Sequence, residues 1–159
     1  MMRKFIFIFC ILLLSAKSTA WVTTDQVNKV YSKIIKIYTL KNYPRLQFLE
    51  GWDEEAQMFE STAYFSLNKN TITFTFILLE EIQNEDEIAS ILLHELGHWA
   101  NSDVGDKLSQ ELRADRFSVY YISKVGYNKC KGLGWIKRGN FPKSKYYPSS
   151  KQRLRNASC

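Results

Sequence analysis

The sequence predicts an α+β domain made of a few antiparallel strands and several helices. Three segments carry apolar residues at helical spacing, and two segments between the first and second of these are rich in aromatic and β-branched residues, which favours strands. The chain has 159 residues, and this length argues for one domain rather than two. The predicted order is helix, strands, helix, helix and tail.

The first 20 residues have the layout of a secretory signal peptide. Arg3 and Lys4 supply positive charge, residues 5–14 form an unbroken apolar run, and small residues lead up to Ala20. An uncleaved membrane anchor is the alternative, but a bilayer core needs about 20 apolar residues and this run is too short. We therefore expect cleavage after Ala20 and a secreted or periplasmic protein.

The mature chain would comprise residues 21–159, which we expect to form a single domain with a basic, irregular tail from about residue 128. It would keep two cysteines, Cys130 and Cys159. In an oxidising compartment such a pair predicts one disulfide, which ties the tail back to the domain. Two free thiols in a reducing compartment are the alternative, and the signal peptide argues against them.

Charge is distributed unevenly along the chain, whose net charge is +6. Residues 21–115 hold 8 basic and 16 acidic residues, whereas residues 116–159 hold 11 basic residues and no acidic ones. A basic tail favours an anionic envelope surface as a partner, such as a membrane or a cell-wall polymer. An equal alternative is that the two halves of the chain face and neutralise each other. The tail contains no nucleic-acid-binding motif, so no specific nucleic-acid partner is predicted.

The first predicted helix carries apolar residues at helical spacing up to Tyr38, with Thr24 or Asp25 positioned to cap it. Residues 45–49 could form a first strand. Residues 60–67 and 71–76 predict a hairpin, because both are rich in strand-forming residues and a short polar turn separates them.

Two further helices follow the hairpin. Asn84, with Glu87 three residues later, resembles a capping box and opens a helix over Glu85–Ala100. Another helix is predicted over residues 107–124, with Gly126 suited to its C-terminal cap. Beyond about residue 128 the chain is rich in Gly, Lys, Pro and Ser, and we expect mostly irregular structure there.

The helix over Glu85–Ala100 contains an HExxH motif, His94-Glu95-Leu96-Gly97-His98. Residues four apart lie one turn above each other, so both imidazoles can bind one metal ion. These are the only two histidines of the chain. Glu95 can reach a water molecule on the metal, beside the first histidine. The alternative, two hydrogen-bonded core histidines, is less compatible with this spacing.

A third ligand is needed, because catalytic zinc usually takes three protein ligands and a water molecule. No third histidine exists, and the cysteines are expected to pair with each other. Glu111 and Asp115 lie four residues apart on the next predicted helix. One carboxylate can bind the metal while the other accepts a hydrogen bond from a ligand histidine. The alternative is that both are ordinary surface acids.

A zinc ion held in this way would lower the pKa of its bound water to about 7. Glu95 would accept the proton as general base and return it to the leaving amine. The oxyanion that forms needs a further hydrogen-bond donor. With no histidine left, four residues are candidates that the sequence does not rank: Tyr120, Tyr121, Tyr147 and Arg153.

Residues 63–127 resemble the gluzincin peptidases related to CAAX-prenyl proteases and heat-shock membrane metallopeptidases, and especially their compact soluble members, the minigluzincins. The resemblance rests on the HExxH motif, on the helix from Glu111 to Asp115 and on the strand before the motif. Tyr147 and Arg153 are similar to a C-terminal family motif that begins with histidine and ends with arginine. The resemblance implies a small zincin-like domain, in which a short antiparallel sheet packs on a zinc-motif helix and a glutamate-bearing helix.

The same resemblance implies that Glu111 is the third zinc ligand and that Asp115 supports the site from behind. It also implies that a peptide or protein substrate lies extended along the strand that runs from Thr71 to Phe76, by β-augmentation. The short gap after His98 leaves no room for the transmembrane insert of the membrane-embedded relatives. The prenyl-peptide substrates of those relatives therefore do not carry over to this chain. Together with the signal peptide, the motifs lead us to expect a secreted zinc-dependent peptidase.

Two other functions share parts of this pattern. Peptide deformylase has the two-histidine helix but needs a cysteine ligand upstream of it, and the only upstream cysteine, Cys10, lies in the signal peptide. A non-catalytic zinc-containing module that binds the envelope, or an inert secreted binding module, is the other possibility. Glu95 favours the peptidase, because a structural zinc site needs no carboxylate beside its first ligand.

Overall fold

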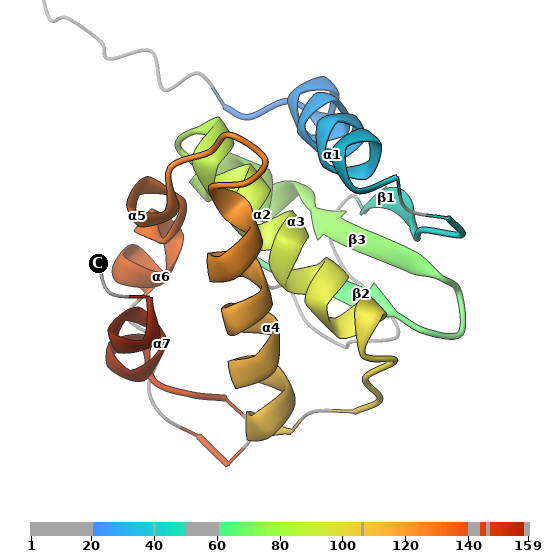
Figure 1. Ribbon diagram of the computed structural model, residues 1–159. Coiled ribbons are helices and arrows are strands. Elements are labelled where there is room, and N and C mark those ends of the chain that lie inside the picture. Colours follow the sequence, from blue (N-terminus) through green and yellow to red (C-terminus); the bar gives the residue numbers. More distant parts are fainter. Residues whose placement is uncertain are drawn as a thin grey trace, which may run out of the picture.

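A three-stranded mixed sheet and a long buried helix form the centre of the computed structural model (Figure 1). The structure describes residues 21–39, 41–49, 61–105, 107–139, 144–145 and 147–157. The elements in chain order are α1 (Thr24–Tyr38), β1 (Arg45–Leu49), β2 (Ala63–Ser66), β3 (Thr71–Thr75), α2 (Phe76–Glu81), α3 (Glu85–Ala100), α4 (Leu108–Ile122), α5 (Lys129–Gly132), α6 (Gly134–Gly139) and α7 (Ser150–Asn156).

The sheet has the strand order β1–β3–β2. β2 and β3 form the predicted antiparallel hairpin, but β1 runs parallel to β3, with Arg45 opposite Thr71. The α+β fold class is therefore confirmed, whereas the wholly antiparallel sheet is not. Alternation of polar and apolar residues determines which face of a strand is buried, but it does not determine the direction of its neighbour.

β3 is the central strand, and all five of its residues are buried. Both of its edges are hydrogen-bonded, one to β1 and the other to β2. An extended peptide can add only to a free strand edge. The expectation that substrate pairs along residues 71–76 is therefore wrong, and the last of these residues, Phe76, already begins α2.

Side-chain caps mark the starts of α1 and α3. Thr23 caps α1 in a capping box with Gln26, rather than Thr24 or Asp25 as predicted. Asn84 caps α3 as predicted, and its side chain accepts a hydrogen bond from the Glu87 N–H. The short helix α2 was not predicted, because its sequence continues the apolar run of β3.

α3 lies at the centre of the core, and its residues from Glu87 to Gly97 are all buried. α1 packs on α3 through Val27, Val30 and Ile34, which are fully buried. α4 runs alongside α3, and the sheet lies beyond α3 in the view of Figure 1. The motif-bearing helix is thus held on several sides by the rest of the domain.

The tail is helical where irregular structure was expected. α5, α6 and α7 lie beside α4 in Figure 1, and the N-caps of α5 and α7 are Asn128 and Ser149. Arg138 of α6 forms a two-armed ion pair with the buried Glu87 of α3, with both distances 2.7 Å. Composition alone did not show these helices, because each is too short for a periodic pattern and depends on its caps and packing.

None of the helices in the described ranges has the length and apolar character required to cross a membrane. Residues 1–20, for which the signal peptide is predicted, lie outside the described residues.

Candidate metal centre

Three side chains from two helices converge at the predicted metal site. The Nε2 atoms of His94 and His98 lie 3.1 Å apart, and each is 3.4 Å from a carboxylate oxygen of Glu111. Two ligand atoms of a tetrahedral zinc ion, with bonds of about 2.0–2.1 Å, lie about 3.3 Å apart. The three side chains therefore fit one zinc ion.

The local structure explains this convergence. His94 and His98 are four residues apart on α3 and so project from the same side of it. Glu111 lies in the first turn of α4, the helix that packs along α3. The structure thus brings together the three residues that the sequence analysis assigned to the metal.

Behind His94 lies an ion pair between Asp115 and Arg153. The His94 Nδ1–H donates to Oδ1 of Asp115 across 3.0 Å. The Arg153 guanidinium in turn donates from Nε and Nη2 to the same carboxylate, at 2.6–3.2 Å. Both charged side chains are 7% exposed. Asp115 therefore accepts the Nδ1 proton, which leaves Nε2 of His94 as the ring nitrogen that can bind a metal ion.

Arg153 was one of four candidates for stabilising an oxyanion. Its guanidinium instead donates hydrogen bonds to Asp115 and stacks over the ring of Trp135, with 4.8 Å from Cζ to the ring centroid. The structure therefore places Arg153 behind a ligand histidine. α7 carries this side chain to its position. The composition of the tail did not predict this helix.

The three tyrosine candidates have other surroundings. Tyr120 and Tyr121 lie nine and ten residues beyond Glu111 on α4, which corresponds to about 14–15 Å along a helix. Tyr121 packs against Tyr38, and Tyr120 is exposed beneath the ammonium of Lys124. The structure therefore does not bring these two tyrosines together with the metal cluster. Tyr147 precedes α7, where it is exposed and its backbone is bonded to Ser144.

Behind His98 lies an aspartate that the sequence analysis missed. The His98 Nδ1–H donates to Oδ2 of Asp103 across 3.0 Å, and Arg113 binds the other carboxylate oxygen. Asp103 lies in the loop between α3 and α4, five residues after His98. The sequence did show an acidic residue shortly after the HExxH motif. It did not show that this residue contacts His98, because the conformation of a loop does not follow from residue spacing.

The charged side chains of the site shift one another's pKa values strongly. Burial lowers the pKa of His94, but hydrogen bonds to Asp115 and Glu111 raise it by more, to about 10. Burial likewise raises the pKa of Glu111, yet hydrogen bonds from His94 and His98 hold it well below its ordinary value. The negative charge of Glu111 and the basic histidines together suit a cation at this position.

Glu95 is buried at 5% exposure beside these ligands. Burial raises its pKa, while the neighbouring charges of His94 and His98 lower it by a smaller amount. A carboxylate with a raised pKa is a stronger proton acceptor. The site therefore offers a metal-binding cluster with a potential base next to it.

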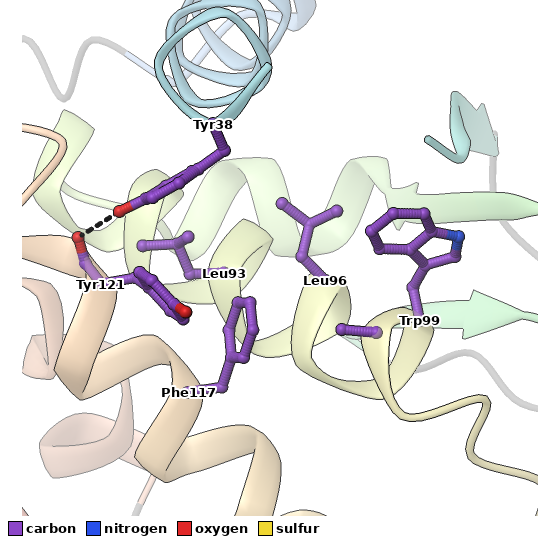
Figure 2. A pocket seen from close by; sticks show the side chains of 7 residues that line it. Tyr38, Leu93, Leu96, Trp99, Phe117 and Tyr121 are labelled. Carbon is purple, nitrogen blue, oxygen red and sulfur yellow. Dashed lines mark hydrogen bonds between the residues drawn. The ribbon is translucent and has the colours of Figure 1, made fainter. Parts of the chain in front are cut away.

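An apolar cavity of about 160 Å³ lies on the opposite side of α3. Leu93 and Leu96 line it from α3, Phe117 and Tyr121 from α4, and Tyr38 from α1 (Figure 2). Its α3 residues project away from the side that carries the two histidines. The cavity is therefore separate from the metal centre.

A model of peptidase family M48 matches residues 23–135, which include α1, the sheet, both histidines, Glu95 and Glu111. Among curated proteins, no match was found. The matched range ends before α7, so Arg153 lies outside it.

Proposed function

This chain belongs to peptidase family M48 and is therefore a zinc metallopeptidase, and we propose that Glu95 is the general base of its reaction and that it acts outside the cytoplasm. The zinc ligands would be His94, His98 and Glu111. The observation that carries this proposal is the convergence of those three side chains, at tetrahedral spacing, beside a buried glutamate.

Each residue of the site has a chemical role in this proposal. Zinc, when bound, polarises the substrate carbonyl and lowers the pKa of water. Glu95 takes a proton from the attacking water at its carboxylate and then delivers that proton to the leaving amine. Asp115 and Arg153 keep the His94 proton on Nδ1. The substrate is a peptide or protein. The proposal does not include pairing of the substrate with a strand of the sheet.

The test is to replace Glu95 by glutamine, which keeps the shape of the side chain but cannot accept the proton. Glu95→Gln should bind one zinc ion per chain as the wild type does, and it should lose peptide hydrolysis by about 10²–10⁴-fold. Zinc content is measured by elemental analysis and cleavage with a peptide library. Glu80→Gln, at an exposed position on α2, is the matched control.

The outcomes separate the candidate functions. A Glu95→Gln variant as active as the wild type would show that hydrolysis does not depend on this base. A wild-type chain that holds zinc firmly and cleaves no library peptide would favour the non-catalytic, envelope-binding alternative.

The extracytoplasmic location is supported by the charged, apolar and small segments of residues 1–20. Expression with its own N-terminus in a secretion-competent host should yield a protein that begins at Trp21. N-terminal sequencing of the exported protein is the measurement. An N-terminus at Met1 in the cytoplasmic fraction would refute the proposed location.

We also propose that the basic tail contacts an anionic envelope surface. Arg138 and Arg153 are neutralised by acidic residues of α3 and α4. Among the described residues, the other exposed cations of α5–α7 form no ion pair, including Lys131, Lys137 and Arg155. The tail and the acidic half therefore neutralise each other only in part. Salt-sensitive sedimentation with phosphatidylglycerol vesicles, but not with neutral vesicles, is the expected result.

A further inference from the structure

Two similar arrangements support the two histidines of the proposed metal site. His94 donates to Asp115, which Arg153 holds, and His98 donates to Asp103, which Arg113 holds. The first arrangement joins α3, α4 and α7. The second uses the loop between α3 and α4, and the peptidase reaction described above assigns it no role.

Asp103 is held at three points. Its Oδ2 accepts from His98 Nδ1–H at 3.0 Å, and its Oδ1 accepts from Nη2 of Arg113. Its backbone N–H donates to the His98 carbonyl, also at 3.0 Å. The Asp103 side chain is 5% exposed and that of Arg113 is 43% exposed. The carboxylate therefore has a defined position and is neutralised by a cation that reaches it from the surface.

The turn after α3 does not need this carboxylate for closure. The Asn101 side chain donates to the Gly97 carbonyl, and the Ser102 N–H donates to the Trp99 carbonyl. The backbone N–H of Asp103 closes the turn further, and any residue other than proline could supply it. The buried negative charge is thus directed at the imidazole rather than at the loop.

We propose that Asp103 is a positioning residue for His98, and that Arg113 keeps it in place. By accepting the Nδ1 proton, Asp103 leaves the Nε2 lone pair directed at the space shared with His94 and Glu111. Its charge also makes the imidazole a stronger donor to a cation. The inference rests on the proposed metal site, and it adds the residues that govern how strongly His98 binds the metal.

Asp103→Asn tests this proposal with a side chain of the same shape. An asparagine amide can donate to Nδ1, which moves the histidine proton to Nε2 and blocks the metal-binding atom. Zinc affinity, measured by competition with a chelator, should fall about 10–100-fold. Nitrogen-15 NMR of a histidine-labelled, metal-free sample, at a pH where the imidazoles are neutral, should show the loss of the Nδ1–H tautomer at one imidazole. The spectrum is simple because the chain has only two histidines.

Substitutions of Arg113 provide a second, independent test of the proposal. Arg113→Gln should weaken zinc binding by less than Asp103→Asn, since the aspartate remains, and Arg113→Lys should restore part of the loss. Arg116→Gln is the matched control, because Arg116 lies on the same helix, exposed and without an ion pair to the described residues. Circular dichroism verifies that each variant is folded.

An Asp103→Asn variant that keeps the Nδ1–H tautomer and wild-type zinc affinity would overturn the proposal. That outcome would not affect the assignment of His94, His98 and Glu111 as metal ligands, since the wild type would still bind zinc. A wild-type chain that binds no zinc would refute the metal site, and this inference with it.

Discussion

Gly97 of α3 lies so close to Ala114 of α4 that a Cβ atom on residue 97 would stand 2.9 Å from the Ala114 Cα. The same Cβ would stand 3.1 Å from Cβ of Phe117. The missing side chain lets the two helices approach each other next to His98. Glu111 lies three residues before Ala114 on α4, about one turn away, so this close contact determines how near Glu111 comes to the histidines.

Gly97→Ala should therefore weaken both the fold and the metal site. The new methyl group meets backbone atoms, and overpacking of this kind costs about 1–3 kcal/mol, against about 1 kcal/mol gained from the helix propensity of alanine. We expect a lower midpoint of thermal unfolding and weaker zinc binding, measured by calorimetry and chelator competition. Ser109→Ala, on the exposed side of α4, is the control. Unchanged zinc affinity in Gly97→Ala would show that the helix separation does not govern the position of Glu111.

Arg153→Gln should lower zinc affinity together with stability. Removing the cation leaves the buried charge of Asp115 with His94 as its remaining partner, and breaking a buried pair costs up to about 3–5 kcal/mol. Because Asp115 orients His94, zinc affinity should also fall by about 10–100-fold. Arg155→Gln, exposed on the same helix, should leave both properties unchanged. If Arg153→Gln loses turnover while binding zinc normally, the arginine acts on the substrate instead.

Zinc should stabilise the protein more as the pH rises. In the metal-free chain the pKa of His94 is raised from 6.5 to about 10, so its protonated form stabilises the fold below pH 6.5. That contribution is lost as the pH rises through about 10. Zinc competes with this proton, and its affinity should increase up to about tenfold per pH unit for each proton displaced.

The measurement is the unfolding midpoint with and without zinc at several pH values between about 6 and about 9, where zinc has to displace the proton that His94 retains up to about pH 10. The gap between the two midpoints should widen toward alkaline pH. A gap that stays constant would contradict proton displacement from the ligand histidines.

Cys130 and Cys159 should form a disulfide in the exported protein. Cys159 lies outside the described residues, but Ala157 packs with Leu133 and Ile136, close in sequence to Cys130. Closing a loop of this length should stabilise the fold by about 3–4 kcal/mol in the chain-entropy model. Mass spectrometry after non-reducing digestion is the measurement. Recovery of two alkylated thiols would refute the bridge and weaken the extracytoplasmic proposal.

The sequence alone determined the local features of the site. The spacing of His94 and His98 places both imidazoles on one side of a helix, and Asn84 marks where that helix begins. Because the chain has no third histidine, Glu111 and Asp115 were the candidates for the third metal ligand. Their spacing places both on one side of the next helix. These features were predictable because they depend on helix geometry and on residues a few positions apart.

Only the tertiary structure decided which distant groups meet. It paired Arg153 with Asp115 and Asp103 with His98, and it placed β3 in the middle of the sheet. A periodic pattern shows which side of an element is buried, but it does not show which element covers that side. Those contacts depend on how loops and short capped helices turn the chain, and their conformations are stable only once the whole domain is packed.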